Sequence, residues 1–165
     1  MKVLALESSC DETAVAIIED GHLLSSVVSS QIDIHSRFGG VVPEIAARKH
    51  LEIIDKIVGS SLEEAHLELE NIDVFASTMG PGLVGSLLVG LSFAKAMALS
   101  TNKPFIGINH LFGHVYANFL KYPFLRPPFM VLLVSGGHSE ILVLRDWDRI
   151  ELIGKTRDDA AGEAF

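Results

Sequence analysis

Cysteine and long apolar runs are scarce in this chain. Cys10 is the only cysteine among 165 residues, which excludes an intramolecular disulfide and suits a reducing compartment. The apolar run that follows Met1 is too short for a signal peptide. The most apolar stretch, residues 83–99, is interrupted by Lys95 and falls short of the roughly 20 apolar residues of a membrane span. We therefore predict a soluble, cytoplasmic protein.

Basic residues are also in the minority. The chain has 13 Lys and Arg against 21 Asp and Glu, a formal net charge of −8. An acidic protein repels phosphate backbones on average, so a role on nucleic acid would need a local basic patch or a partner. Hydrophobic residues make up 48% of the chain, which permits a sizeable core and argues against disorder. The length suits one domain, or one domain plus part of another.

The first 30 residues predict three consecutive strands, over 2–9, 13–20 and 22–30. Asp20-Gly21 lies between two apolar runs, which is a strong signal for a hairpin turn. Later strands are expected over 72–80 and 103–110. Strands that alternate with helical segments indicate an α/β fold.

The helical segments are marked by their first residues and by their apolar pattern. Residues 33–42 are predicted to form a loop, and Pro43 then begins a helix, as proline favours the first helical turn. We expect this helix to break at Gly59 and to resume as an acidic piece over 62–71. Its predicted buried face is Ile45, Ile53, Ile54 and Ile57. Two more helices are predicted, from about residue 84 to 100 and over 110–121.

Residues 129–154 repeat the pattern of residues 2–29, with strands joined first by a small-residue turn and then by an acidic one. The proline-rich segment 121–128 precedes this second copy and is typical of a domain boundary. We therefore predict two domains, 1–125 and 126–165, of which the second is incomplete.

The turns SSCDE (8–12) and VSGGHS (134–139) occupy matching places in the two copies. Small residues let backbone N–H groups approach a phosphate, so these two turns are candidates for gripping a nucleotide from two sides. Asp11 and Glu12 are candidates to hold a cation, orient a reacting group or act as a general base. The alternative is that both segments are ordinary solvated turns.

His110 and His114 lie four residues apart, on one face of the predicted helix. Imidazole suits Zn or Fe, although a structural role for the pair remains the alternative. The zincin peptidase pattern needs a Glu directly after its first His, and Leu111 stands there instead.

The helix over 84–100 has a glycine-rich beginning, GPGLVG (80–85), that is a candidate anion site. It is not a P-loop, because no Lys-Ser/Thr pair follows. Small residues recur at spacing four along the helix, at Ser86, Gly90, Ala94 and Ala98. They allow close packing either inside the chain or at a subunit interface.

The segments ESSCDETAVAI, FGGVVPEIAARKH, GPGLVGSLLVG, NHLFGH, LLVSGGHS and DDAAGEAF, in this order, resemble the bacterial tRNA N6-adenosine threonylcarbamoyltransferase family (TsaD type, formerly O-sialoglycoprotein endopeptidase). The resemblance covers essentially all of the chain and implies the N-terminal half of a family member. It implies an actin-like fold of the sugar kinase/Hsp70 superfamily. Such a fold has a ribonuclease-H-like domain followed by a second one, of which only the first strands would be present here.

The resemblance also implies an activity. Family members transfer a threonylcarbamoyl group from threonylcarbamoyl-adenylate to N6 of adenosine 37 in tRNAs that read codons beginning with adenine. The family's metal histidines match His110 and His114, which implies one Fe(2+) or Zn(2+) per subunit. Its third protein ligand, an Asp, would lie beyond Phe165. The family's substrate loop matches Leu133, Val134, Ser135, Gly136 and Gly137, so threonylcarbamoyl-adenylate or ATP/ADP is expected in the cleft.

Asp11 and Glu12 remain hypothetical catalytic residues that assist the attack of the adenosine amine. The implied partners are a paralogous actin-like subunit (TsaB type), a small P-loop ATPase (TsaE type) and tRNA, with no membrane. Family chains are about twice this long, so we expect this chain alone to be inactive, and its second domain to be disordered, exchanged or paired in a homodimer. The alternative functions are a non-catalytic partner of the same fold, a metallopeptidase by the older family label, and a kinase-like ATPase.

Overall fold

A computed structural model describes residues 1–164, with side chains for 1–162, and Phe165 lies outside the described residues. The chain divides into two compact units, Met1–Gly113 and His114–Phe165. The division falls within helix α4 (His110–Lys121), so each unit is described by itself. The domain boundary expected between residues 125 and 126 stays a prediction.

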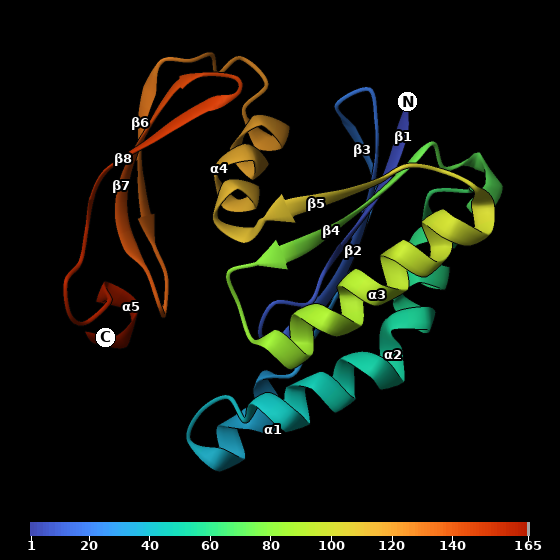
Figure 1. Cartoon of the computed structure of the whole chain (residues 1–165), viewed down its shortest axis with the longest axis horizontal. Helices are drawn as coiled ribbons and strands as arrows, with labels where there is room; N and C mark the ends of the chain where they lie inside the picture. The colour runs from blue at the N-terminus through green and yellow to red at the C-terminus, as the bar shows by residue number, and fades with distance from the viewer. Residues whose placement is uncertain (165) are drawn as a thin grey trace. The chain divides into compact units, whose positions relative to one another are not determined.

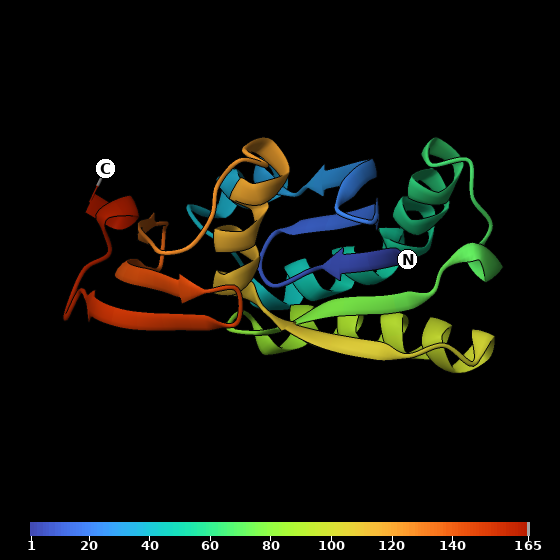
Figure 2. The ribbon, with the colours of Figure 1, turned by 90° about the horizontal axis from the view of Figure 1, so that it is seen from above.

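The first unit contains a five-stranded sheet with the order β3-β2-β1-β4-β5 (Figure 2). The strands are β1 (Lys2–Glu7), β2 (Glu12–Glu19), β3 (His22–Ser30), β4 (Val74–Gly80) and β5 (Phe105–Asn109). β2 pairs antiparallel with β1 and β3, whereas β1, β4 and β5 are mutually parallel. All five predicted strands of this unit are confirmed, and so is the α/β class.

The predicted hairpin between β2 and β3 is also confirmed. Asp20 and Gly21 both have positive φ, at 50° and 84°. Two consecutive residues in this region match the right-handed twist of the flanking strands, which is why an Asp-Gly pair is favoured here.

The segment predicted as a loop contains helix α1 (Ile32–His35) and the 3-10 helix η1 (Ser36–Phe38) instead. The backbone carbonyl of Gln31 accepts the N–H groups of Ile34 and His35, at 2.9 and 3.1 Å. The side chains of Gln31 and His35 are buried and hydrogen-bonded to each other at 3.1 Å. The burial of these two side chains stabilises the helical turns, and no local sequence pattern predicts it.

Helix α2 (Pro43–Glu64) begins at Pro43 as predicted, but it passes through Gly59 without a break. The predicted acidic helical piece is reduced to the last turn of α2 and the 3-10 helix η2 (Leu69–Asn71). A glycine in a helix interior costs about 1 kcal/mol, and packing against the sheet offsets a cost of that size. Of the predicted buried face, Ile54 is buried and Ile57 is partly buried against the core, whereas Ile45 and Ile53 are only partly buried. The observed buried residues are Ala46, His50, Ile54, Val58 and Ser61.

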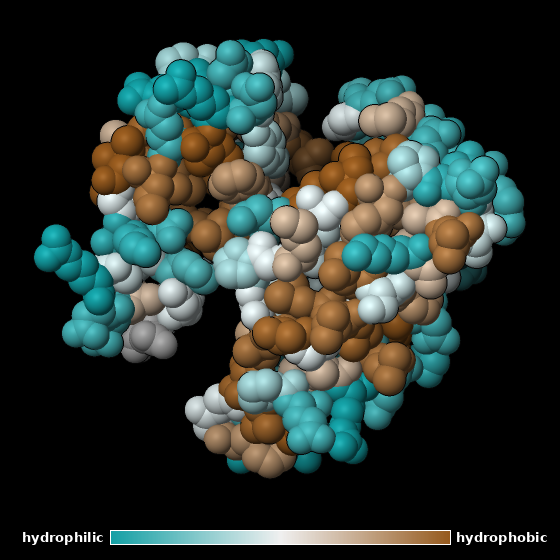
Figure 3. Space-filling model, viewed as in Figure 1, coloured by the Kyte–Doolittle hydropathy of each residue, from teal (hydrophilic) through white to brown (hydrophobic). Residues whose placement is uncertain are grey.

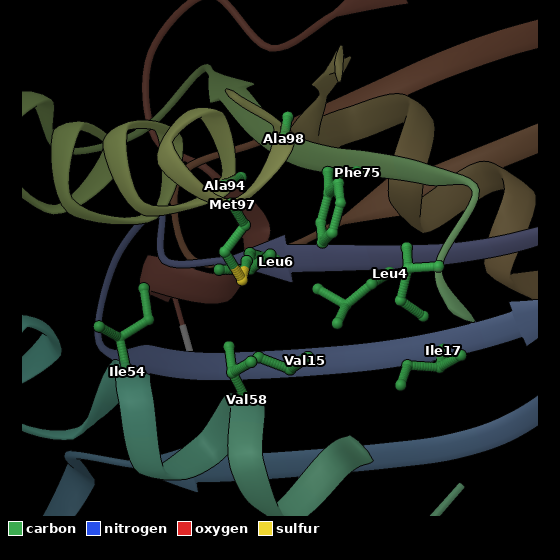
Figure 4. Packing of buried hydrophobic residues seen from close by; sticks show 11 residues of the cluster. Leu4, Leu6, Val15, Ile17, Ile54, Val58, Phe75, Ala94, Met97 and Ala98 are labelled. Atoms are coloured by element: carbon green, nitrogen blue, oxygen red, sulfur yellow. The ribbon is translucent and has the colours of Figure 1, made fainter. Parts of the chain in front are cut away.

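The core lies between the sheet and two helices, α2 and α3 (Val84–Thr101), which cover one face of the sheet (Figure 1). Figure 4 shows side chains of this core from the sheet and from both helices. They are Leu4 and Leu6 of β1, Val15 and Ile17 of β2, Phe75 of β4, Ile54 and Val58 of α2, and Ala94, Met97 and Ala98 of α3.

The small residues at spacing four in α3, namely Ser86, Gly90, Ala94 and Ala98, are all buried within the unit. The internal-packing interpretation of this stripe is therefore confirmed. The opposite side of the helix is an apolar surface, with Val84, Leu88 and Leu99 exposed (Figure 3). This composition gives α3 the length and hydropathy of a membrane span, yet its buried face belongs to the core.

The second unit contains a three-stranded antiparallel sheet of β6 (Phe129–Val134), β7 (Ser139–Asp146) and β8 (Arg149–Lys155), in sequence order. The same meander is formed by β1, β2 and β3, so the internal repeat is confirmed as a repeat of topology. Val115 of α4 and Leu142 and Leu144 of β7 are buried here. The short helix α5 (Ala161–Ala164) ends the described chain.

Candidate functional site

Three parallel strands of the first unit end at the same edge of the sheet. Glu7 is the last residue of β1, Thr78 lies near the end of β4, and His110 directly follows β5. In open α/β sheets, ligands bind outside the carboxyl ends of parallel strands. The topology therefore gathers these three side chains at the edge where a site is expected.

The Glu7 carboxylate is the centre of this group. Its Oε2 accepts the Thr78 hydroxyl at 2.5 Å and lies 3.0 Å from Nδ1 of His110. Its Oε1 accepts the backbone N–H of Ser9, and the Ser9 hydroxyl lies 3.2 Å from the same His110 nitrogen. Both oxygens of the carboxylate are thus occupied by donors from three different segments.

The pKa of Glu7 follows from a competition between burial and hydrogen bonding. Burial disfavours the charged form and would raise the pKa. The hydrogen bonds from His110, Ser9 and Thr78 outweigh burial and hold the pKa of Glu7 at about 2. Glu7 is therefore ionised throughout the physiological range, and it can only accept hydrogen bonds.

The turn that holds Asp11 and Glu12 is tied to the rest of the unit through its backbone carbonyls. The Ser9 carbonyl accepts the N–H of Leu83 at 2.7 Å, just before α3 begins. The Asp11 carbonyl accepts the N–H of Gln31 at 2.9 Å. An added Cβ at Gly82 would lie 2.6 Å from the Ser9 carbonyl oxygen. The GPGLVG segment, a candidate anion site from the sequence, is therefore a close structural neighbour of this turn.

A buried histidine is hydrogen-bonded to the backbone of the same turn. His50 of α2 is fully buried, and its Nε2 donates to the Cys10 carbonyl at 3.0 Å. Its Nδ1 accepts the Thr13 hydroxyl at 2.7 Å. Burial lowers the pKa of His50, more strongly than its hydrogen bond to the Cys10 carbonyl raises it. His50 is thus a neutral imidazole that links helix α2 to the turn.

Asp11 is half-buried within the turn, and Glu12 is exposed at the first position of β2. Cys10 is exposed between them and Ser9. Partial burial, reinforced by the negative charge of Asp11, raises the pKa of its thiol to about 11, so Cys10 is a neutral thiol and a poor nucleophile.

His110 is the first residue of α4, and His114 follows one turn later in the same helix. Residues at this spacing share a face of a helix, and two imidazoles are suitable ligands for Zn or Fe. Within residues 1–162, no group of three or more His, Cys, Asp or Glu side chains is arranged to hold a metal ion. The pair therefore fits part of a metal's ligand set.

The predicted substrate loop lies at the end of β6 in the second unit. Leu133 is buried, whereas Val134, Gly136 and Gly137 are exposed. The N–H of Ser135 donates to the carbonyl of His138 at 2.8 Å and closes the turn. The loop is thus a defined turn that presents glycine backbone to solvent.

Helix α5 lies directly against this loop. Its first N–H, at Ala161, donates to the Ser139 hydroxyl at 2.8 Å. An added Cβ at Gly162 would lie 2.5 Å from the Ser135 carbonyl oxygen. The glycine of the DDAAGEAF motif is therefore explained by its close approach to the loop.

Sequence reasoning missed the parts that Glu7 and Thr78 play at the sheet edge. Glu7 is a charged residue at the end of an otherwise apolar run, directly before the small-residue turn. This position was the sequence signal from which a functional role for Glu7 could have been predicted. Thr78 carried no signal, because only the pairing of β1 with β4 brings it next to Glu7.

Comparisons with known proteins agree on one family. The family model TsaD, described as tRNA N6-adenosine threonylcarbamoyltransferase, matches residues 22–165. The curated enzyme of that name from Kosmotoga olearia is 68% identical over the whole chain, which covers 50% of that protein. The one from Caldicellulosiruptor saccharolyticus is 61% identical, again over the whole chain and 49% of the relative. The chain thus spans about half the length of the curated relatives it matches.

Solved structures support the fold independently. YeaZ from Pseudomonas aeruginosa superposes with a TM-score of 0.62 at 17% identity, covering 94% of this chain and 65% of that one. A ROK hexokinase from Thermus thermophilus superposes with a TM-score of 0.54 at 18% identity. The match covers 92% of this chain and 49% of the hexokinase. These likenesses confirm the predicted actin-like fold. With the family match over most of the sequence, they establish that the chain belongs to the TsaD family of tRNA N6-adenosine threonylcarbamoyltransferases.

Proposed function

We propose that this chain is part of an enzyme that transfers a threonylcarbamoyl group from threonylcarbamoyl-adenylate to N6 of adenosine 37, in tRNAs that read codons beginning with adenine. The observation that carries the proposal is the clustering of Glu7, Thr78 and His110 at the carboxyl edge of the sheet, beside the turn with Asp11 and Glu12. The family match supplies the chemistry that this site would serve.

In the proposed reaction, the adenosine amine attacks the carbamoyl carbon of the donor. A new C–N bond forms, the bond from that carbon to the phosphate oxygen breaks, and AMP leaves. Asp11 or Glu12 accepts the proton that the amine loses. The exposed backbone of Gly136 and Gly137 binds the donor threonylcarbamoyl-adenylate, and ATP or ADP is the alternative ligand of the same loop.

His110 and His114 would hold one Fe(2+) or Zn(2+), together with a ligand from outside the described residues. Bound by these residues, the metal would act as a Lewis acid toward a carbonyl or phosphoryl oxygen of the donor. Because this chain has a formal net charge of −8, the remaining half and the partners would provide much of the tRNA surface.

The proposed partners are a paralogous actin-like subunit of the TsaB type and a small P-loop ATPase of the TsaE type, in the cytoplasm. YeaZ shares the fold of this chain, which is the relationship expected between paralogous subunits. We propose that pairing with such a subunit takes precedence over a homodimer of this chain.

The test uses an enzyme in which this chain is continued to the full length of its relatives, combined with both proposed partners. We expect modified adenosine 37 by mass spectrometry of a tRNA transcript, and no product from a transcript with guanosine at that position. Glu12→Gln is expected to slow the transfer at least tenfold. Glu52→Gln, on the exposed side of α2, is the matched control and should leave the rate unchanged.

The alternatives give different results in the same experiment. ATP hydrolysis without any threonylcarbamoyl donor would favour a kinase-like ATPase. Peptide cleavage that depends on His110 would favour a metallopeptidase, although Leu111 occupies the place of that chemistry's base. Unmodified tRNA in every combination would contradict the proposal and favour a non-catalytic module.

A further inference from the structure

The contact between Glu7 and His110 specifies which ring nitrogen of His110 carries a proton. Glu7 Oε2 lies 3.0 Å from Nδ1, and a carboxylate can accept a hydrogen bond but not donate one. Nδ1 must therefore be the protonated nitrogen of the neutral ring. The Ser9 hydroxyl, 3.2 Å from the same nitrogen, is also able to accept.

The surroundings of Glu7 keep its carboxylate in place for this task. Thr78 from β4 donates to Oε2, and the backbone N–H of Ser9 donates to Oε1. About a third of the Glu7 side chain and a quarter of the His110 side chain are exposed, at 32% and 25%. The pair therefore lies at the rim of the site and is partly shielded from water.

We infer that Glu7 is a positioning residue that locks His110 in the Nδ1–H tautomer and orients its ring, so that Nε2 is the nitrogen with the lone pair. This inference deepens the proposed function, on which its metal-binding consequence rests. A histidine that ligates a metal usually donates its other ring N–H to a carboxylate or carbonyl. Glu7 would then make Nε2 of His110 the ligand atom.

Glu7→Gln tests the tautomer directly, because an amide has one acceptor oxygen and one donor nitrogen where the carboxylate has two acceptors. The backbone N–H of Ser9 can only donate, so the amide oxygen of Gln must take the place of Oε1. The amide NH2 then takes the place of Oε2 and faces Nδ1 of His110. A donor at that place requires Nδ1 to accept, which moves the ring proton to Nε2. Glu7→Gln is therefore expected to reverse the tautomer, and Glu7→Ala to leave a mixture.

The experiment is a long-range 15N–1H correlation spectrum of this chain with labelled histidine, recorded at alkaline pH where imidazole rings are neutral. The His110 signals are assigned by their loss in His110→Gln. We expect Nδ1–H in the wild type, Nε2–H in Glu7→Gln and no change in Glu52→Gln. Thr78→Val removes a donor to Glu7 without altering its acceptor for His110, so the wild-type tautomer should persist. This variant separates loss of the tautomer lock from general loosening of the site.

A wild-type spectrum with Nε2–H, or a Glu7→Gln spectrum with the proton still on Nδ1, would overturn the inference. Amide spectra of each variant establish that it is folded, and Glu7→Ala serves as the second variant if Glu7→Gln does not fold. Titration with Zn(2+) alone then tests the consequence, with an affinity about 10- to 100-fold weaker expected for Glu7→Gln. If the tautomer reverses while Zn(2+) binds neither protein, the Glu7 lock stands and the metal part of the proposed function fails.

Discussion

Gly90 of α3 lies against Ser8, in the turn that follows β1. An added Cβ at Gly90 would be 2.4 Å from the Ser8 hydroxyl oxygen. That hydroxyl accepts the Gly90 N–H at 3.2 Å and donates to the Ser86 carbonyl at 2.8 Å. The absence of a side chain at Gly90 therefore lets helix α3 and the turn share a buried hydrogen bond.

Gly90→Ala should destabilise the chain by about 1–3 kcal/mol, because the added methyl group overpacks a filled space and displaces Ser8. Gly59→Ala in α2 is the matched control, since nothing lies within 4 Å of its added Cβ. That change should stabilise the chain by about 0.4–1 kcal/mol. Urea unfolding measures both, and equal effects of the two substitutions would contradict the role given to Gly90.

His50 should make stability fall as the solution becomes acidic. Burial lowers the pKa of His50 below 6.5 in the folded chain, so the unfolded chain binds the proton more readily. Its contribution to stability is therefore complete above the unfolded pKa, and it is lost as pH falls from that value through the lower folded pKa.

The test for His50 is urea unfolding across the acidic range for wild type and His50→Gln. The variant should lose about 1–3 kcal/mol at neutral pH, because the partners Thr13 and the Cys10 carbonyl are left less well satisfied. The difference between the two proteins should narrow towards acid pH. A difference that does not change with pH would show that His50 is not a buried neutral base.

Cys10 should react slowly with alkylating reagents although it is exposed. Burial and the neighbouring Asp11 raise its thiol pKa from 9 to about 11, which leaves about 100-fold less thiolate than in an unperturbed thiol. Mass spectrometry of iodoacetamide-treated chain measures the rate at a single site, because Cys10 is the only cysteine. Asp11→Asn should accelerate the reaction, and a rate equal to that of a free thiol would contradict the raised pKa.

The two faces of the second sheet should respond differently to truncation. Leu144 of β7 is fully buried, whereas Leu132 of β6 is 70% exposed. Leu144→Ala is expected to cost about 2–5 kcal/mol, and Leu132→Ala to remain within about 0.5 kcal/mol. Thermal unfolding of the two variants compares them directly. A large loss from Leu132→Ala would show that this face is covered in solution.

Local sequence was sufficient to predict those turns and helix ends that are determined by local interactions. The Asp-Gly turn between β2 and β3 needs positive φ at two adjacent residues, and Pro43 suits the first turn of α2. The family was evident from the motifs, because each keeps its residues at fixed spacing whatever surrounds them. His110, His114 and the 133–137 loop were predicted as site residues from the same motifs, and Asp11 and Glu12 from their place in the turn after the first strand.

The sequence by itself thus determined the strands, the hairpin, most of the helices and the family. Tertiary structure decided the strand order, the unbroken path of α2 through Gly59, and the buried face that contains His50. It also decided the setting of Glu7, whose partners Thr78 and His110 are 71 and 103 residues away along the chain. Contacts of this kind depend on which strands pair, and that is decided by how the whole core packs rather than by any local pattern.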